Sequence, residues 1–280
     1  MKHYFFFTIL IILSSCADNK NAHIADQPET IKEKQITKPE FQAIIDSAQV
    51  EGSVLIYDFQ EDVHYSNNFQ WANKGNLPAS TFKIVNSIIA LETGVVKDDS
   101  TLFKWDGKKR RMKAWEQDLI FRDAFHASCV PCYQEVARSI GEKRMNEYLT
   151  KLDYGNMQVD SSNIDNFWLE GNSHINQFQQ IDFLKRFYKS ELPISKRTEK
   201  IMKRLMVIED NERYRLIGKT GWSIRNGNNN GWFVGYVEKK QEVYFFATNV
   251  EPQEQFNMEL FSMIRKEVTG KALKQIGIIK

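Results

Sequence analysis

The stretch Ser80-Thr81-Phe82-Lys83 holds the two side chains best placed for nucleophilic chemistry. It follows Pro78 and opens an apolar, periodic run that ends at Gly94, which are start and stop signals of a helix. Residues three apart share one helical face, so we expect the Lys83 amine near the Ser80 hydroxyl. A serine needs such a base before it can attack a carbonyl carbon. By itself, S-x-x-K also fits an N-cap serine followed by a solvated lysine.

Three further motifs occur where an acyl-transfer site needs polar groups. Ser128-Cys129-Val130 connects two predicted helices, Tyr154-Gly155-Asn156 forms a predicted turn, and Lys219-Thr220-Gly221 ends a predicted strand. Gly221 is expected to let a substrate lie against the backbone. Arg265, on the last predicted helix, offers a planar guanidinium to a carboxylate. Each motif is weak alone, but the ordered set S-x-x-K, S-x-V, Y-G-N and K-T-G predicts a serine acyl-transfer site.

Composition excludes several other classes of protein. The 280 residues are 42% hydrophobic and 26% charged with a formal net charge of only +2, which is typical of a globular chain. No electrostatic attraction to nucleic acid is implied, and neither a GxGxxG motif nor a P-loop is present. No metal site is predicted.

The N-terminus has the pattern of a secretory signal. Lys2 precedes an apolar run from Tyr4 to Leu13, which is too short to span a membrane stably. The following L-S-S-C resembles the bacterial lipobox, which implies cleavage before Cys16 and its acylation; an ordinary signal with a free Cys16 is the alternative. We therefore expect a signal peptide over 1–15, a polar tether over 16–38 and a folded domain over 39–280. The protein is expected in the bacterial cell envelope, periplasmic and lipid-anchored to a membrane.

Cys129 and Cys132 are the only other cysteines and are spaced C-V-P-C. The spacing fits a redox pair in a reducing compartment or a short disulfide in an oxidising one. Our prediction is two small, buried thiols that serve in packing.

The secondary-structure pattern predicts an α+β fold. The two ends of the chain are expected to build one antiparallel sheet flanked by helices, the middle forms a helical subdomain, and Ser80 lies at their junction. Strands are predicted over 52–59, 63–66, 214–217, 232–237 and 243–250. Helices are predicted over 39–49, from Ser80 to Gly94, 123–127, 131–152 with a break at Gly141, 178–189, 195–207 and 255–273, and 101–118 is expected to be irregular.

The chain resembles the class D, or oxacillinase-type, serine β-lactamases over nearly all of residues 40–280. The resemblance is carried by P-A-S-T-F-K-I, W-E-Q-D-L, A-S-C-V-P, G-E-K-R-M, Y-G-N, F-W-L-E-G, K-T-G-W and G-W-F-V-G-Y-V-E. It implies the fold shared by serine β-lactamases and penicillin-binding transpeptidases, and small β-lactams as substrates. Cys129 and Cys132 depart from the small apolar residues common there, and the Gly-Asn-rich loop after K-T-G-W is short.

The same resemblance implies a role for each motif. Ser80 would attack the lactam carbonyl, with the amides of Ser80 and Trp222 as oxyanion hole. Lys219, Thr220 and Arg265 would hold the substrate carboxylate. Ser128 would protonate the departing nitrogen, and Tyr154 would shape the pocket.

Lys83 needs help to act as a base, because an ordinary lysine has a pKa of about 10.4. Burial lowers the pKa of a lysine. The resemblance adds that a neutral Lys83 captures CO₂ as a carbamate, with the Trp168 indole N–H as its donor and Val130 and Leu169 keeping the pocket apolar. CO₂ or bicarbonate is then the only co-reactant, without a bound cofactor. Glu170 is the competing base.

Two other functions remain open at this point. β-Lactam sensor domains resemble class D enzymes and are acylated at the same serine without turnover. They follow several transmembrane segments, whereas here only a lipobox and tether are expected. A penicillin-binding transpeptidase is the third option. The sequence leaves open which β-lactams are bound, the oligomeric state and the membrane leaflet.

Overall fold

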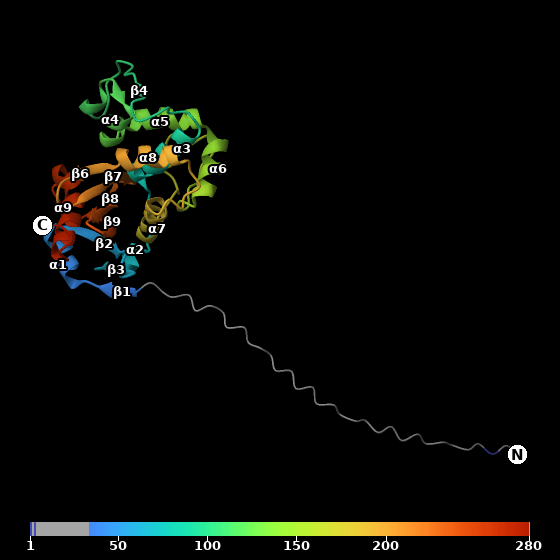
Figure 1. Ribbon diagram of the computed structural model, residues 1–280, viewed down its shortest axis with the longest axis vertical. Helices are drawn as coiled ribbons and strands as arrows, with labels where there is room; N and C mark the ends of the chain where they lie inside the picture. Colours follow the sequence, from blue (N-terminus) through green and yellow to red (C-terminus); the bar gives the residue numbers. More distant parts are fainter. Residues whose placement is uncertain (2, 4–33, 280) are drawn as a thin grey trace. The chain divides into compact units, whose positions relative to one another are not determined.

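A seven-stranded sheet, antiparallel except for one edge pair, organises the folded unit (Figure 1). The computed structural model describes residues 1, 3 and 34–279. The strand order is β1-β3-β2-β9-β8-β7-β6. The strands are β1 (Lys34–Thr37), β2 (Val50–Asp58), β3 (Val63–Ser66), β6 (Val207–Asp210), β7 (Arg215–Arg225), β8 (Asn228–Lys239) and β9 (Glu242–Pro252). Both ends of the folded unit thus contribute neighbouring strands, as predicted.

Two-residue turns set the register of the three longest strands. Asn226 and Gly227 join β7 to β8, and both have a positive φ, at 50° and 81°. An Asn-Gly pair is the preferred sequence for such a turn, because both positions require this backbone conformation. Lys240 and Gln241 join β8 to β9, and of these two only Lys240 has a positive φ, at 56°. The polar residues after K-T-G-W therefore extend the strands, which are longer than predicted.

Helices cover both faces of the sheet (Figure 1). On one face, α1 (Pro39–Ser47) packs with α9 (Phe261–Gln275), which follows the short turn η3 (Met258–Leu260). Phe41, Ile45 and Val268 belong to the buried core there, together with Val54 and Phe246 from the sheet. On the other face, α7 (Gln177–Tyr188) packs against β9 and joins the larger core.

The middle of the chain forms the helical side that we predicted. It consists of α3 (Lys83–Glu92), α4 (Phe121–His126), α5 (Val130–Ile140), α6 (Glu142–Leu152) and α8 (Lys196–Leu205). Gly141, with φ of 78°, separates α5 from α6, as expected. Smaller elements are α2 (Phe69–Ala72), η1 (Ala79–Phe82), β4 (Leu102–Phe103), η2 (Lys113–Trp115) and β5 (Leu119–Ile120).

Some predicted boundaries were wrong. Residues 34–37 were expected to belong to a weakly structured tether, but they form β1 and pair in parallel with β3. Val207 was predicted as the end of a helix, but it starts β6 and pairs with Ile217. The predicted signal peptide, Cys16 and most of the tether lie outside the described residues. Within the described part of the chain, no helix is long and apolar enough to cross a membrane.

Candidate active site

Ser80 lies in the short 3₁₀ turn η1, immediately before α3, rather than in the helix itself. Lys83 is the first residue of α3, and its Nζ donates a hydrogen bond of 3.1 Å to Ser80 Oγ. Both residues are buried: Ser80 is 8% exposed and Lys83 is 1% exposed. The predicted contact between the serine and the lysine is therefore confirmed, and the solvated-lysine alternative is excluded.

The turn that carries Ser80 is fixed by neighbours from several elements. Ala79 precedes the serine with φ of 50°, a conformation that costs free energy for a residue with a Cβ. Four hydrogen bonds oppose its relaxation. They run from Ala79 N to Trp168 O (2.9 Å), Trp232 Nε1 to Leu77 O (2.9 Å), Thr81 Oγ1 to Pro78 O (2.6 Å) and Gln180 Nε2 to Thr81 Oγ1 (2.9 Å).

A glycine is needed at position 221 for a different reason from the one predicted. A Cβ at this position would lie 3.0 Å from the Pro78 carbonyl oxygen and 3.2 Å from Thr81 Cγ2. The glycine therefore lets β7 pack directly against the serine turn, instead of making room for a substrate on that side. This contact brings the K-T-G strand to the nucleophile.

The amine of Lys83 lies in an apolar environment. Burial lowers its pKa to about 7, because removal from water disfavours the charged form. The Tyr133 ring faces it, with Nζ 4.9 Å from the centroid. The neutral amine is therefore accessible near neutral pH and can accept a proton from Ser80.

Trp168 carries an unsatisfied buried donor. Its side chain is fully buried and stacks on Phe82, with 5.6 Å between ring centroids. Its Nε1 finds no hydrogen-bond partner among the described residues. Such an orphaned N–H is costly unless an acceptor occupies the space beside it. A carbamate on Lys83 fits this donor set, whereas Glu170 is exposed to solvent.

A second serine–lysine pair is built by distant segments. Lys219 Nζ, from β7, donates a hydrogen bond of 2.5 Å to Ser128 Oγ. Ser128 has a positive φ of 52°, and it lies in the connection between α4 and α5. The pKa of Lys219 is held well below its usual value by burial, and further by the positive charges of Lys83, Arg265 and Lys266. The two pairs thus belong to one site.

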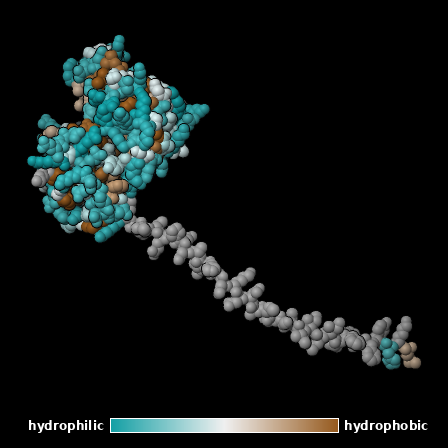
Figure 2. Space-filling view, viewed as in Figure 1, coloured by the Kyte–Doolittle hydropathy of each residue, from teal (hydrophilic) through white to brown (hydrophobic). Residues whose placement is uncertain are grey.

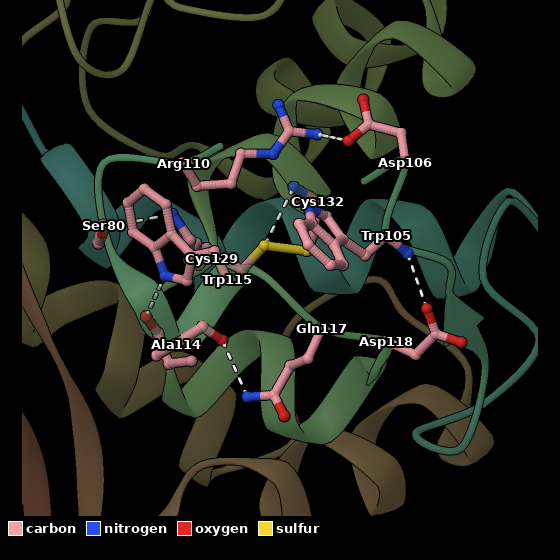
Figure 3. Close-up of a disulfide and its surroundings, with 12 residues drawn as sticks. Ser80, Trp105, Asp106, Arg110, Ala114, Trp115, Gln117, Asp118, Cys129 and Cys132 are labelled. Atoms are coloured by element: carbon pink, nitrogen blue, oxygen red, sulfur yellow. Dashed lines mark hydrogen bonds and ion pairs between the residues drawn. A yellow bond between two sulfur atoms is a disulfide. The ribbon is translucent and has the colours of Figure 1, made fainter. Parts of the chain in front are cut away.

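The pair Cys129–Cys132 corrects our prediction. The two residues form a disulfide with 5.4 Å between their Cα atoms (Figure 3). Cys129 is the N-cap of α5, and its Sγ also accepts the Cys132 amide at 3.3 Å. The bend before α5 brings the two side chains together, which the C-x-x-C spacing alone did not determine. The disulfide therefore closes the turn between Ser128 and α5.

Trp115 and Tyr133 were not singled out from the sequence. Trp115 Nε1 donates to Ala127 O at 2.9 Å and supports the segment before Ser128 (Figure 3). The Tyr133 hydroxyl and Ser87 Oγ share one hydrogen bond of 2.8 Å. This bond orients the face of the Tyr133 ring toward Lys83. Trp115 lies in the stretch that we expected to be irregular, and it entered the sequence analysis only as the first residue of W-E-Q-D-L, without a role.

The remaining predicted residues surround these pairs. Arg265 is 7% exposed, and burial lowers its pKa to about 10, so it stays a cation at neutral pH. Its guanidinium carbon lies 6.0 Å from the centroid of Trp222, whose Nε1 donates to Asn229 Oδ1 at 2.9 Å.

Thr220, Val130 and Leu169 are half-buried, and Val130 and Leu169 pack against the larger core. Tyr154 is buried and donates to Gln180 Oε1 at 3.1 Å, so it supports the serine turn indirectly.

Known proteins share this architecture and sequence. Residues 26–274 match the family described as the penicillin binding protein transpeptidase domain. β-Lactamase OXA-48 of Klebsiella pneumoniae is 42% identical over 258 residues, covering 92% of this chain and 95% of that protein. β-Lactamase OXA-10 of Pseudomonas aeruginosa is 45% identical over 217 residues, covering 76% and 80%.

Solved structures agree with the sequence comparison. The class D β-lactamase from Sebaldella termitidis has a TM-score of 0.83 and 37% identity, covering 89% of this chain and 100% of that one. The class D β-lactamase YbXI from Nostoc has a TM-score of 0.82 and 42% identity, covering 85% and 99%. The chain belongs to the class D serine β-lactamases, within the penicillin-binding transpeptidase family.

Proposed function

We propose that this chain hydrolyses the β-lactam ring of penicillin-type antibiotics through an acyl-enzyme on Ser80, and so confers β-lactam resistance. The observation that carries the proposal is the buried contact between Lys83 Nζ and Ser80 Oγ, 3.1 Å apart. This contact supplies both a nucleophile and a base, which acyl transfer requires.

Acylation follows from the two serine–lysine pairs. The base on Lys83, as its carbamate or as the neutral amine from which the carbamate forms, takes the hydroxyl proton while Ser80 Oγ forms a bond to the lactam carbonyl carbon. The backbone amides of Ser80 and Trp222 stabilise the resulting oxyanion. When the C–N bond breaks, Ser128 gives its proton to the lactam nitrogen and takes one from Lys219, to which it is hydrogen-bonded. The proton taken from Ser80 passes from Lys83 to Lys219, and the low pKa of Lys219 lets its ammonium form give that proton up to Ser128, which leaves the base on Lys83 free for the next step.

The substrate carboxylate would bind to Lys219, Thr220 and Arg265. Arg265 supplies positive charge, and the Lys219 amine and the Thr220 hydroxyl supply hydrogen bonds. The Nε of Arg265 is buried without a partner among the described residues, so contact with the substrate would come from the terminal nitrogens, of which Nη1 already donates to Phe261 O at 3.2 Å. Placement of this carboxylate orients the lactam carbonyl toward Ser80.

Deacylation needs a base for the incoming water, and Lys83 is the base within reach of Ser80. A carbamate formed on Lys83 from CO₂ would supply an anionic base in place of an amine. The buried Trp168 N–H would donate to this anion, and the half-buried, apolar Val130 and Leu169 would help to keep the unmodified amine neutral. Glu170 is exposed and is the less suitable base.

A steady-state assay with a chromogenic cephalosporin tests hydrolysis against the sensor alternative. We expect many turnovers per molecule. A single burst equal to the enzyme concentration, followed by a stable adduct, would instead identify a sensor domain.

The carbamate is tested separately. Activity should fall in CO₂-free buffer and recover with bicarbonate, and ¹³C-bicarbonate should give a carbamate carbonyl NMR signal that Lys83→Ala removes. Trp168→Ala should raise the bicarbonate requirement, because the anion loses about 1–3 kcal/mol of stabilisation. Indifference of the wild type to bicarbonate, together with acyl-enzyme accumulation in Glu170→Gln, would assign the base to Glu170.

We further propose that a lipid on Cys16 anchors the protein to a bacterial membrane on its periplasmic side. The motif L-S-S-C supports this, and the disulfide fits an oxidising compartment. Labelling with radioactive palmitate should mark the wild-type chain but not Cys16→Ala. An unlabelled wild type would refute the anchor.

A further inference from the structure

A strongly basic stretch lies outside the residues assigned to the active site. Six of the ten residues from 104 to 113 are cationic: Lys104, Lys108, Lys109, Arg110, Arg111 and Lys113. All of them are exposed except Arg110, which is half-buried. The whole chain carries a formal charge of only +2, so this is a local accumulation of positive charge.

Neighbouring acids neutralise only part of this charge. Asp106 pairs with Arg110 at 2.6 Å and with Lys108 at 3.6 Å, and Glu116 pairs with Lys113 at 2.6 Å. Lys104, Lys109 and Arg111 form no ion pair within the described part of the chain. With Asp118 included, residues 102–118 keep an excess of three positive charges.

Large apolar side chains are exposed among these cations. Leu102, Trp105 and Met112 are 50%, 37% and 48% exposed. The Trp105 indole donates to Lys108 O at 2.8 Å, and its amide donates to Asp118 Oδ1 at 2.9 Å, so the ring is held at the surface. Figure 2 shows apolar patches among hydrophilic ones at this end of the unit. We call residues 102–113 the basic–aromatic surface.

We propose that the basic–aromatic surface docks onto an anionic phospholipid surface. Cations near such a surface are attracted to its headgroups, while tryptophan and long aliphatic side chains enter the interfacial region. A nucleic acid would use the cations but not an exposed Met112 and Leu102. The Cys129–Cys132 disulfide, next to this segment, also fits a compartment outside the cytoplasm.

This contact would be additional to any lipid on Cys16. β4, which begins the basic–aromatic surface, lies at the outer end of the helical side, whereas β1 lies at the other end of the folded unit (Figure 1). The 17 residues between Cys16 and Lys34 can span at most about 60 Å. A domain of this size is about 45 Å across, so an anchored chain can still turn this surface toward the membrane.

Amide hydrogen exchange of the full chain tests the proposal, because it reports on this segment whether or not the N-terminus is anchored. Phosphatidylcholine vesicles that contain phosphatidylglycerol should protect residues 102–113, and pure phosphatidylcholine vesicles should not. In Lys108→Gln/Lys109→Gln/Arg111→Gln, the phosphatidylglycerol needed for half-maximal protection should rise about 100-fold, since each cation contributes about fivefold. Met112→Ser should weaken protection less, by severalfold.

Matched variants control for general charge and hydrophobicity. Lys143→Gln/Lys200→Gln/Lys274→Gln removes the same charge from exposed positions elsewhere, and Met263→Ser alters a methionine that is 59% exposed, against 48% for Met112. Both should behave like the wild type. Equal protection on neutral vesicles, no protection on either kind, or equal protection by an RNA homopolymer without lipid would overturn the proposal.

Discussion

The two serine–lysine pairs of the active site are built in opposite ways. Ser80 and Lys83 are three residues apart and meet because one helical turn places them together. Ser128 and Lys219 are 91 residues apart and meet only because β7 and the segment before α5 converge. The first pair is therefore a local property of the chain, and the second is a property of the whole fold.

Their electrostatic environments differ accordingly. Burial alone lowers the pKa of Lys83, whereas the pKa of Lys219 is lowered by burial and by three neighbouring cations. Lys83 is suited to accept a proton, and Lys219 to give one away through Ser128. Both pKa values are lowered, so the difference in task comes from the partner serine: Ser80 loses a proton to Lys83, whereas Ser128 receives one through Lys219.

Removal of Lys83 should produce the largest effect. Lys83→Ala takes the base from both chemical steps, so we expect kcat to fall by about 10²–10⁴-fold and the acyl-enzyme to persist. Steady-state kinetics and intact-mass spectrometry would measure this, with the exposed Lys143→Ala as control. Unchanged turnover in Lys83→Ala would remove this residue from the mechanism.

Removal of Ser128 should affect only one step. Ser128→Ala leaves Lys83 and Ser80 in place but breaks the proton path from Lys219 to the lactam nitrogen. We expect acylation to slow by about 10²-fold, with hydrolysis of the ester little changed. Single-turnover experiments separate the two rates, and a selective loss of deacylation would mean that the two pairs are not divided as we infer.

The buried Lys83 should make stability depend on pH. Its folded pKa of about 7 lies below its ordinary value of 10.5, so the unfolded chain binds more protons between these values. The free energy of unfolding therefore gains a contribution that rises with pH through this window. In CO₂-free buffer, Lys83→Met should raise the melting temperature most near pH 7 and less at pH 9. A constant difference, as expected for the exposed Lys200→Met, would show that the folded pKa is normal.

Loss of the disulfide should have the smallest effect on activity. Cys129→Ala/Cys132→Val opens a loop of only a few residues, so the free energy of unfolding should fall by about 2 kcal/mol. Turnover should be retained, because Trp115 and Lys219 still hold the segment around Ser128. Denaturant titration and steady-state kinetics measure both quantities. A loss of activity like that of Ser128→Ala would give the disulfide a positioning role.

The same contrast explains what the sequence could predict. Helical periodicity was enough to bring Lys83 to Ser80, because their contact depends on a single turn. The joining of Ser128 to Lys219 could be expected only from the resemblance to class D enzymes, since no local pattern links residues so far apart.

Other features depended on tertiary context. The disulfide was mispredicted because C-x-x-C fits thiols and a disulfide alike until the bend before α5 is known. β1 has no strong pattern of its own and is ordered by pairing with β3. Gly221 was expected beside a substrate, but a side chain is excluded there by Pro78, which lies 143 residues earlier in the chain.

The central claim is that Ser80 forms the covalent intermediate, and peptide mapping after reaction with benzylpenicillin tests it most directly. Lys83→Ala should trap the ester, so the adduct should be found on the peptide that contains Ser80. In Ser80→Ala no adduct should form, although Lys219 and Ser128 are unchanged. An adduct on Ser128, or full labelling of Ser80→Ala, would contradict the account.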